Sequence, residues 1–395
     1  MSAYKPKTVV MACSHPYWSV LQVGSQHLAR QFARHGWQVH YFSAPVTPLH
    51  LLKLSTPEVL QRFKRVFYNP SIHENGMIHS HLPFSLIAPD GRFPLRSKPV
   101  TRSWYKTLMP SLKQRIQKAG INRVSLLYID NISYHFLTEQ LSFEKSLFRV
   151  MDMHERFPGW EGEARPLAEK IARKADITAY SANGLKSYID RLGPNKAILV
   201  PNGVDFDLFD FKKNRQHRKR PASIQHIPDP IALYTGIIDS RIDFNVIKTA
   251  AKQLPRVSFV LAGPAEAANG LSDLPANVYP IGPVPHPALP DLMRSAVAGL
   301  IPFDVNNQMG AIKGIRPLKL FEYMAAGLPA ISARWPEVEE IGGPVWFYDN
   351  AREFVSLVQK AIHPQEFDPA AARRFAGRFD WKKVFEALIS NVDPL

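Results

Sequence analysis

Residues 316–332 have the sequence pattern of a short helix followed at once by a strand, and this pattern narrows the possible folds more than any other in the chain. Apolar residues recur there at helical spacing, at Leu318, Phe321, Met324 and Ala325. Gly327 predicts a left-handed end to the helix, and Pro329 prevents its continuation. The short apolar run at 330–332 is typical of a strand. A helix, a tight turn and a strand in this order indicate an α/β fold.

The polar residues of the same helix suit a phosphorylated ligand. Arg316 precedes the helix, Lys319 lies in its first turn, and Glu322 can share a face with Lys319 at i+3. The free N–H groups at a helix N-terminus bind anions, and a carboxylate one turn deeper can accept hydrogen bonds from the two hydroxyls of a ribose. The alternative interpretation is a Lys–Glu pair on the surface of an ordinary amphipathic helix.

The string K-L-F-E-Y-M-A-A-G-L-P-A-I resembles the nucleotide-sugar helix of GT-B glycosyltransferases, in particular the GT4-like enzymes of bacterial polysaccharide synthesis. The resemblance implies two Rossmann-like domains facing across a cleft, and Glu322 on the nucleotide ribose. Many GT4 enzymes carry another Glu eight residues earlier, where this chain has Gly314. This departure, together with Lys319, makes the chain more similar to the xanthan-type glucuronosyltransferases.

The resemblance also implies donor contacts from the start of the second half. A strand predicted from Ile231 ends at Gly236, and the loop after it holds Arg241. In this superfamily the corresponding loop carries basic residues that touch the donor diphosphate. The alternative is that Arg241 only pairs with Asp239 or Asp243.

Gly236, Arg241, Arg316, Lys319 and Glu322 therefore form the predicted donor site. A loop predicted at 308–315 would cover the phosphates. We expect no metal and no cofactor, because GT-B enzymes typically neutralise the diphosphate with basic residues and helix ends.

The chain opens with a predicted strand at 7–12, a helix at 24–35 and a strand at 37–42. In open parallel sheets, ligands bind beyond the carboxyl ends of the strands. His15 follows the first strand and is a candidate ligand contact. The alternative is a loop histidine with no ligand.

A candidate general base follows a later strand, predicted at 146–151, which runs into Asp152. Sugar transfer with inversion needs a group that takes the proton from the acceptor hydroxyl. The string R-V-M-D resembles the segment that supplies the catalytic Asp of the xanthan-type enzymes. His154 and Glu155 are alternative bases, and Asp152 as the cap of a following helix is the structural alternative.

The formal net charge of +15 suggests an anionic partner. Residues 91–123 contain no acidic residue and nine basic ones: Arg92, Arg96, Lys98, Arg102, Lys106, Lys113, Arg115, Lys118 and Arg123. An apolar stripe runs through them, formed by Trp104, Tyr105, Leu108, Leu112 and Ile116. This pattern predicts a basic amphipathic helix on an anionic membrane surface, or alternatively a core-facing helix with a solvated basic face. No nucleic-acid-binding motif accompanies the charge, so we do not expect a nucleic-acid partner.

Composition and hydropathy indicate the compartment. The single cysteine, Cys13, excludes an internal disulfide and favours a reducing environment. The apolar run near residue 9 is too short for a signal peptide, and no run approaches 18 apolar residues. We therefore expect a cytoplasmic protein that is peripheral on the inner face of the plasma membrane.

The predicted domains are an acceptor-binding Rossmann-like domain at 1–207, a linker at 208–230, a nucleotide-sugar domain at 231–375 and a C-terminal helix at 376–395 that crosses back to the first domain. The linker prediction depends on the basic run at 212–220, for which a nuclear-localisation signal is a poorer explanation.

The predicted function is transfer of a sugar from a UDP-linked donor to a lipid-linked or polysaccharide acceptor, with inversion and an Asp base. The alternatives are a GT-B-fold nucleotide-sugar 2-epimerase, a non-catalytic nucleotide-sugar-binding partner, and a basic nucleic-acid-binding protein.

Overall fold

The computed structural model describes residues 6–53, 57–66, 71–90, 93–121, 123–156, 162–210, 220–265, 270–363 and 365–392. Arg92 and most of the predicted basic linker, 211–219, lie outside the described residues. The chain divides into two compact units. The first comprises residues 1–19, 23–200 and 385–395, and the second comprises 20–22 and 201–384.

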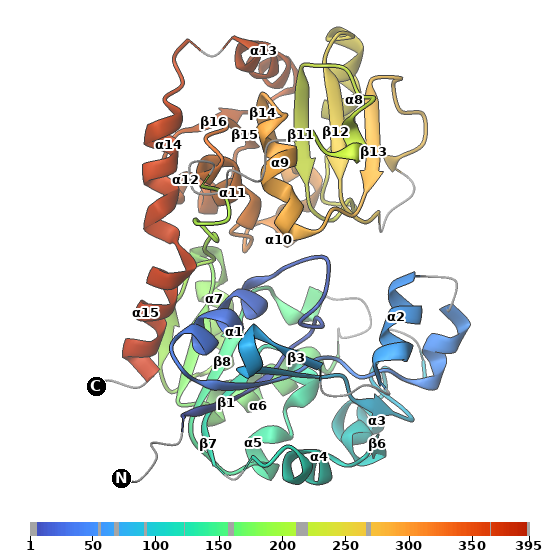
Figure 1. The fold of residues 1–395 in the computed structure, drawn as a ribbon, viewed down its shortest axis with the longest axis vertical. Helices are drawn as coiled ribbons and strands as arrows, with labels where there is room; N and C mark the ends of the chain where they lie inside the picture. Colours follow the sequence, from blue (N-terminus) through green and yellow to red (C-terminus); the bar gives the residue numbers. More distant parts are fainter. Residues whose placement is uncertain are drawn as a thin grey trace. The chain divides into compact units, whose positions relative to one another are not determined.

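The first unit is built on an eight-stranded sheet of order β10-β9-β8-β7-β1-β2-β4-β3 (Figure 1). The strands are β1 Thr8–Ala12, β2 Gln38–Phe42, β3 Ser71–His73, β4 Ile78–His81, β7 Val124–Ile129, β8 Phe143–Val150, β9 Ile177–Tyr180 and β10 Ala197–Leu199. Among the described strands all neighbours run parallel except β3 and β4. The chain leaves β1 toward β2 and returns on the other side at β7, so the strand order reverses between β1 and β7.

The α-helices of the first unit are α1 Gly24–Arg34, α2 Pro57–Val66, α3 Lys98–Ser103, α4 Leu112–Lys118, α5 Leu137–Gln140, α6 Ala164–Lys174 and α7 Lys186–Leu192. A two-stranded antiparallel hairpin, β5 Phe84–Ser85 with β6 Leu108–Met109, lies outside the main sheet. The apolar residues of β1 and β7 are buried and form the centre of the core, as their uninterrupted apolar runs predict.

The second unit contains an all-parallel sheet of order β13-β12-β11-β14-β15-β16. Its strands are β11 Ile231–Thr235, β12 Ser258–Ala262, β13 Val278–Gly282, β14 Ala298–Ile301, β15 Ala330–Ala333 and β16 Val345–Tyr348. Its helices are α8 Phe244–Gln253, α9 Leu289–Arg294, α10 Val305–Ile312, α11 Leu318–Ala325, α12 Pro336–Ile341, α13 Ala351–Ile362 and α14 Pro369–Ala376. The strand order reverses between β11 and β14.

The predicted helix and strand of residues 316–332 are confirmed as α11 and β15. Gly327 has a φ of +75°, which is the left-handed conformation that ends the helix. The final helix, α15 Trp381–Val392, continues from the second unit into the first. Its Phe385 ring meets the Phe32 ring of α1 at a centroid distance of 4.8 Å.

Parts of the segment predicted as a linker pack inside the second unit. Phe209, Ile224 and Ile227 belong to its buried apolar core. The described residues on either side of 211–219 are therefore integrated into the second unit.

The prediction of a loop at 308–315 is wrong, because α10 covers most of it. Asp304 caps this helix by accepting a hydrogen bond from the Asn307 N–H at 3.0 Å. Ile312 is buried and anchors the last turn. Gly310 and Gly314 favoured a loop in the sequence. The Asp304 cap and the buried Ile312 nevertheless stabilise a helix.

The basic segment at 91–123 is not the single amphipathic helix that its pattern predicts. It forms α3, the 3-10 helix η3 Trp104–Thr107, strand β6 and then α4. Trp104, Leu108 and Leu112 are buried, and the Trp104 Nε1–H donates to the Ser133 carbonyl at 2.9 Å. The apolar stripe therefore faces the core, as the alternative interpretation states.

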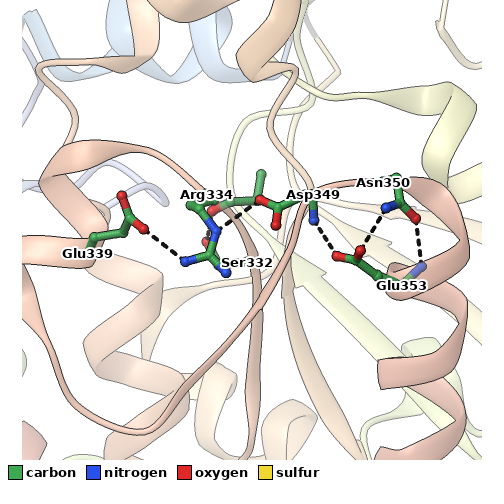
Figure 2. A network of polar contacts seen from close by, with 7 residues as sticks. Ser332, Arg334, Glu339, Asp349, Asn350 and Glu353 are labelled. Carbon is green, nitrogen blue, oxygen red and sulfur yellow. Dashed lines mark hydrogen bonds and ion pairs between the residues drawn. The ribbon is translucent and has the colours of Figure 1, made fainter.

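A polar network joins the carboxyl ends of β15 and β16 to the helices that follow them (Figure 2). Arg334 donates to Glu339 of α12 at 2.8 Å and to Asp349 at 2.9 Å. Asn350 caps α13 by accepting from the Glu353 N–H at 3.0 Å. These groups are exposed, so the network orders the loops and adds little stability.

No helix in the described part of the chain is long and apolar enough to cross a membrane.

Candidate functional site

Lys319 occupies the point where the strand order of the second sheet reverses. Its Nζ lies 3.7 Å from the ring centroid of Tyr234, in β11, and 5.4 Å from that of Phe303, which follows β14. In open parallel sheets, ligands bind at this reversal, beyond the carboxyl ends of the strands. The lysine that the sequence singled out is therefore placed where a ligand is expected.

Tyr323, one turn after Lys319, fastens α11 to the sheet. Its hydroxyl oxygen accepts a hydrogen bond from the Thr235 N–H at 2.9 Å. Gly299 of β14 lets the ring approach, because a Cβ there would lie 2.2 Å from a ring carbon of Tyr323. The ring and this hydrogen bond fix the helix against β11 and β14, and with it the position of Lys319.

Gly236 leaves room for the side chain of Lys319, because it has no Cβ. Its φ is +123°, and a Cβ built on it would lie 2.8 Å from Lys319 Nζ. Gly263, after β12, approaches so closely that a Cβ there would lie 1.8 Å from the Gly236 carbonyl oxygen. Side chains at these two positions would close the end of the sheet, so both glycines are required by the packing.

The charge of Lys319 is not compensated by a direct ion pair with any described carboxylate. Burial lowers its pKa well below the ordinary value, and the positive charge of Arg241 lowers the pKa further. The negative charges of Glu322 and Asp239 raise the pKa of Lys319, although neither carboxylate forms an ion pair with it. A cation held under these conditions is stabilised when an anion binds beside it.

Arg241 pairs with Asp239, as the alternative interpretation states. Its Nε lies 3.0 Å and 2.9 Å from the two carboxylate oxygens of Asp239. Asp243 instead caps α8 by accepting from the Val246 N–H at 3.0 Å. The pair holds the guanidinium in the loop that follows β11, close enough for its charge to act on Lys319.

Glu322 is 8% exposed, and its Oε1 lies 3.2 Å from Nε2 of His286. His286 begins a short 3-10 helix, His286–Ala288, that follows β13. Its ring holds one carboxylate oxygen, while Oε2 accepts no hydrogen bond from the described residues. Sequence analysis missed His286, although its position between two prolines after a predicted strand was a signal for an ordered loop.

Arg316 pairs with a carboxylate of α12, Glu337. It is buried, and its Nη1 lies 3.3 Å from the Glu337 carboxylate. Burial lowers the pKa of Arg316, and Glu337 opposes this shift. The guanidinium also lies 5.2 Å from the centroid of the Phe379 ring. The charge of Arg316 is therefore used to anchor α12 beside the start of α11.

In the first unit, Asp152 is exposed two residues after β8. His154 is buried, its ring stacks on that of Phe148, and its Nδ1 lies 3.3 Å from the Tyr188 hydroxyl. Burial lowers the pKa of His154 to about 4, so the imidazole is neutral at physiological pH. His15 is exposed after β1, and its carbonyl oxygen accepts from the Tyr41 hydroxyl at 3.0 Å.

Asp130 is a residue that sequence analysis missed. It follows β7, at the reversal of the first sheet, and its Oδ1 accepts from the Ser14 N–H at 3.1 Å. Its Oδ2 accepts from the Ser25 hydroxyl at the start of α1. Burial raises the pKa of Asp130 to about 6. The available signal was an acidic residue directly after an apolar strand, the pattern that singled out Asp152.

Among the described residues, no three His, Cys, Asp or Glu side chains come together to hold a metal ion. The lack of a metal in the reaction remains an expectation.

Residues 245–390 match the model of a family described as glycosyl transferase-like. TuaH of Bacillus subtilis, named as a candidate teichuronic acid biosynthesis glycosyltransferase, is 30% identical over 236 residues. The alignment covers 56% of this chain and 57% of TuaH, so the chain matches little more than half of that relative.

Solved structures match almost the whole chain. A glycosyltransferase from Rickettsia africae has a TM-score of 0.65 and 13% identity, and the match covers 98% of each chain. HepE from Anabaena, in complex with UDP and glucose, has a TM-score of 0.63 and 12% identity over 98% of this chain and 100% of HepE. This chain has the GT-B fold. The predicted fold class is thereby confirmed at the level of two Rossmann-like units.

In this GT-B chain, the region that matches the glycosyl transferase-like family contains Lys319, Glu322 and His286. Gly236, Arg241 and the first-unit residues Asp130 and Asp152 lie outside it.

Proposed function

We propose that this protein transfers a sugar from a nucleoside diphosphate sugar, with UDP as the nucleotide, to a hydroxyl of its acceptor. The observation that carries the proposal is Lys319, a cation without a direct ion pair among the described carboxylates, held at the reversal of the second sheet. A diphosphate provides the negative charge that this position lacks. The family match at 245–390 and the UDP in the HepE structure support the same reading.

The donor site assigns a role to each residue. Lys319 and Arg241 neutralise the charge that develops on the departing diphosphate, together with the N-terminus of α11. Gly236 lets the phosphates approach the backbone. Oε2 of Glu322 accepts hydrogen bonds from the ribose hydroxyls, and His286 holds the carboxylate in position.

We propose that the reaction inverts the anomeric carbon. The acceptor oxygen attacks this carbon, the bond to the β-phosphate oxygen breaks, and UDP leaves with its negative charge. Asp152 takes the proton of the acceptor hydroxyl. Asp152 is exposed to an incoming acceptor, whereas Asp130 is buried and both of its oxygens accept hydrogen bonds inside the first unit.

The proposed acceptor is a lipid-linked or polysaccharide glycan of the bacterial surface, at the inner face of the plasma membrane. The assignment of TuaH to teichuronic acid biosynthesis supports this class of acceptor. Gly314 and Lys319 support a place near the xanthan-type glucuronosyltransferases. In this proposal the reaction uses no metal and no cofactor.

Thermal unfolding with UDP, GDP, TDP and ADP tests the donor site. A nucleotide at about 100 times its dissociation constant stabilises the protein by about 2.7 kcal/mol, a rise in Tm of roughly 5–10 °C for a domain of this size. We expect this rise with UDP in the wild type and a smaller one in Glu322→Ala. The exposed Glu366→Ala variant is the matched control. No rise with any nucleotide would overturn the donor assignment.

Transfer itself is tested with UDP-glucose or UDP-glucuronic acid and a bacterial lipid extract. We expect release of UDP and a glycosylated lipid only when the extract is present. A new UDP-sugar isomer formed without the extract would establish the epimerase instead. UDP binding with no turnover of either donor would favour a non-catalytic partner.

A further inference from the structure

Most exposed large apolar side chains fall in one sequence segment of the first unit. The large apolar residues that are exposed in the described chain are Val20, Leu51, Leu52, Leu60, Ile72, Leu86, Ile87, Phe93, Met109 and Leu199. Eight of these ten lie between residues 51 and 109, and none lies in the described parts of 201–384. Exposed apolar residues scattered singly are ordinary, and an interaction surface requires that some of them lie side by side.

The β5–β6 hairpin turns an apolar face outward. Ser85 pairs with Leu108 and both are buried, whereas Phe84 pairs with Met109, which is 53% exposed. Because side chains alternate along a strand, Leu86 shares the outward side with Phe84, and it is 52% exposed. The hydrogen bond from the Leu86 N–H to the Thr107 carbonyl, at 3.2 Å, extends the pairing. We call Phe84, Leu86 and Met109 the hairpin face.

Basic residues surround the hairpin face along the chain. Arg96, Lys106, Lys113 and Lys118 are exposed and form no ion pair with a described carboxylate. Arg115 of α4 donates to the carbonyl oxygens of Met109 at 2.9 Å and Pro110 at 3.2 Å, which ties α4 to the end of β6. The sequence from 91 to 123 contains no acidic residue that would neutralise this charge.

We propose that the hairpin face docks on an anionic lipid bilayer. Leu86 and Met109 enter the interface, and the surrounding lysines contact the lipid headgroups. The apolar contact thus comes from the hairpin, because the stripe formed by Trp104, Leu108 and Leu112 is buried in the core. The inference rests on the proposed function in one respect, since a lipid-linked acceptor requires membrane contact.

Vesicle co-sedimentation of the full-length protein tests the surface. We compare vesicles of phosphatidylcholine alone with vesicles that also contain anionic phosphatidylglycerol, because anionic lipids attract basic segments. The wild type should bind only the anionic vesicles, and less at high salt. Lys106→Glu/Lys113→Glu should weaken partitioning by about 25-fold or more, at roughly fivefold per lost lysine. Leu86→Ser/Met109→Ser should weaken it by about tenfold.

Matched controls carry the same chemical changes elsewhere in the first unit. Lys145→Glu/Lys196→Glu alters the net charge equally at two exposed lysines, and Leu199→Ser alters an exposed apolar residue on the edge strand β10, for comparison with Met109→Ser alone. Both controls should bind like the wild type. The variants should keep an unchanged Tm and an unchanged response to UDP, which separates membrane docking from the donor site.

Three results would overturn the proposal. The first is a wild type that ignores anionic vesicles. The second is binding that the controls weaken as much as the hairpin variants do. The third is tight binding to a single-stranded oligonucleotide that is lost in Lys106→Glu/Lys113→Glu and kept in Leu86→Ser/Met109→Ser, because a nucleic acid uses the cations but not the apolar face.

Discussion

Replacement of Lys319 by methionine should raise the stability of the protein and weaken its binding of UDP. Each unit by which burial lowers a lysine pKa corresponds to about 1.4 kcal/mol of penalty on the charged form. The contact of Nζ with the Tyr234 ring, at 3.7 Å, offsets about 1–2 kcal/mol of that penalty. Methionine has a similar length and carries no charge, so it avoids the penalty. We expect Lys319→Met to be more stable than the wild type at pH 7 by about 1 kcal/mol, or roughly 2–4 °C in Tm.

The same substitution should remove most of the response to UDP. A hydrogen bond to a charged group contributes about 1.5–3 kcal/mol, so the dissociation constant should rise by roughly 10- to 100-fold. At the UDP concentration that stabilises the wild type by about 2.7 kcal/mol, the variant should gain only about 0.4–1.4 kcal/mol. Lys252→Met, at an exposed position of α8, is the matched control and should change neither quantity.

The pH dependence gives a third readout of Lys319. Because its folded-state pKa is below its ordinary value of 10.5, the unfolded chain binds more protons in the interval between the two values. The stability of the wild type relative to Lys319→Met should therefore rise as the pH increases toward 10.5. A variant that is less stable at pH 7 and keeps the full UDP response would refute the reasoning about this site.

Three further predictions concern other residues. Asp152→Asn should lower the transfer rate by about 10²- to 10⁴-fold while leaving the UDP-induced rise in Tm unchanged, and wild-type turnover in this variant would exclude Asp152 as the base. Tyr323→Phe should cost about 1–3 kcal/mol in urea unfolding, because the buried Thr235 N–H loses its partner, whereas Tyr279→Phe on β13 should be nearly neutral. Asp130, with a folded pKa of about 6 against 3.8, binds more protons in the folded than in the unfolded state between these values. The wild type should therefore lose about 2 kcal/mol of unfolding free energy relative to Asp130→Asn as the pH rises from 4 to 6. If the wild type and Asp130→Asn differ by the same unfolding free energy across this interval, the pKa of Asp130 is not raised in the folded protein.

The donor half of the molecule was accessible from local signals. The spacing of apolar residues, the glycine stop and the proline after it predict α11 and β15, and the structure has them at those residues. Lys319 and Glu322 were identified because their spacing on a helix is a local property. The pairing of Arg241 with Asp239 is local as well, and it was foreseen as an alternative.

The charged and aromatic pattern at 91–123 was a weaker guide. An i, i+3, i+4 stripe shows that one side of a segment is apolar, but the same stripe serves a core and a membrane equally well. Pro110 and the pairing of β6 with β5 break the segment, and the core of the first unit takes up Trp104. The exposed residues Leu86 and Met109 could not be recognised, because their outward direction depends on a pairing across more than 20 residues.

The α/β class and the helix that carries Lys319 and Glu322 could be predicted from residues close together in the chain, and the excess of positive charge follows from composition alone. Three sets of contacts could be seen only after folding: the pairing of Arg316 with Glu337, the contact of His286 with Glu322, and the hydrogen bonds that Asp130 accepts from Ser14 and Ser25. These contacts join residues 21 to 116 positions apart, and the folding of each sheet brings them together. Burial of charge follows from the same packing, and with it the pKa of Lys319 and of Asp130.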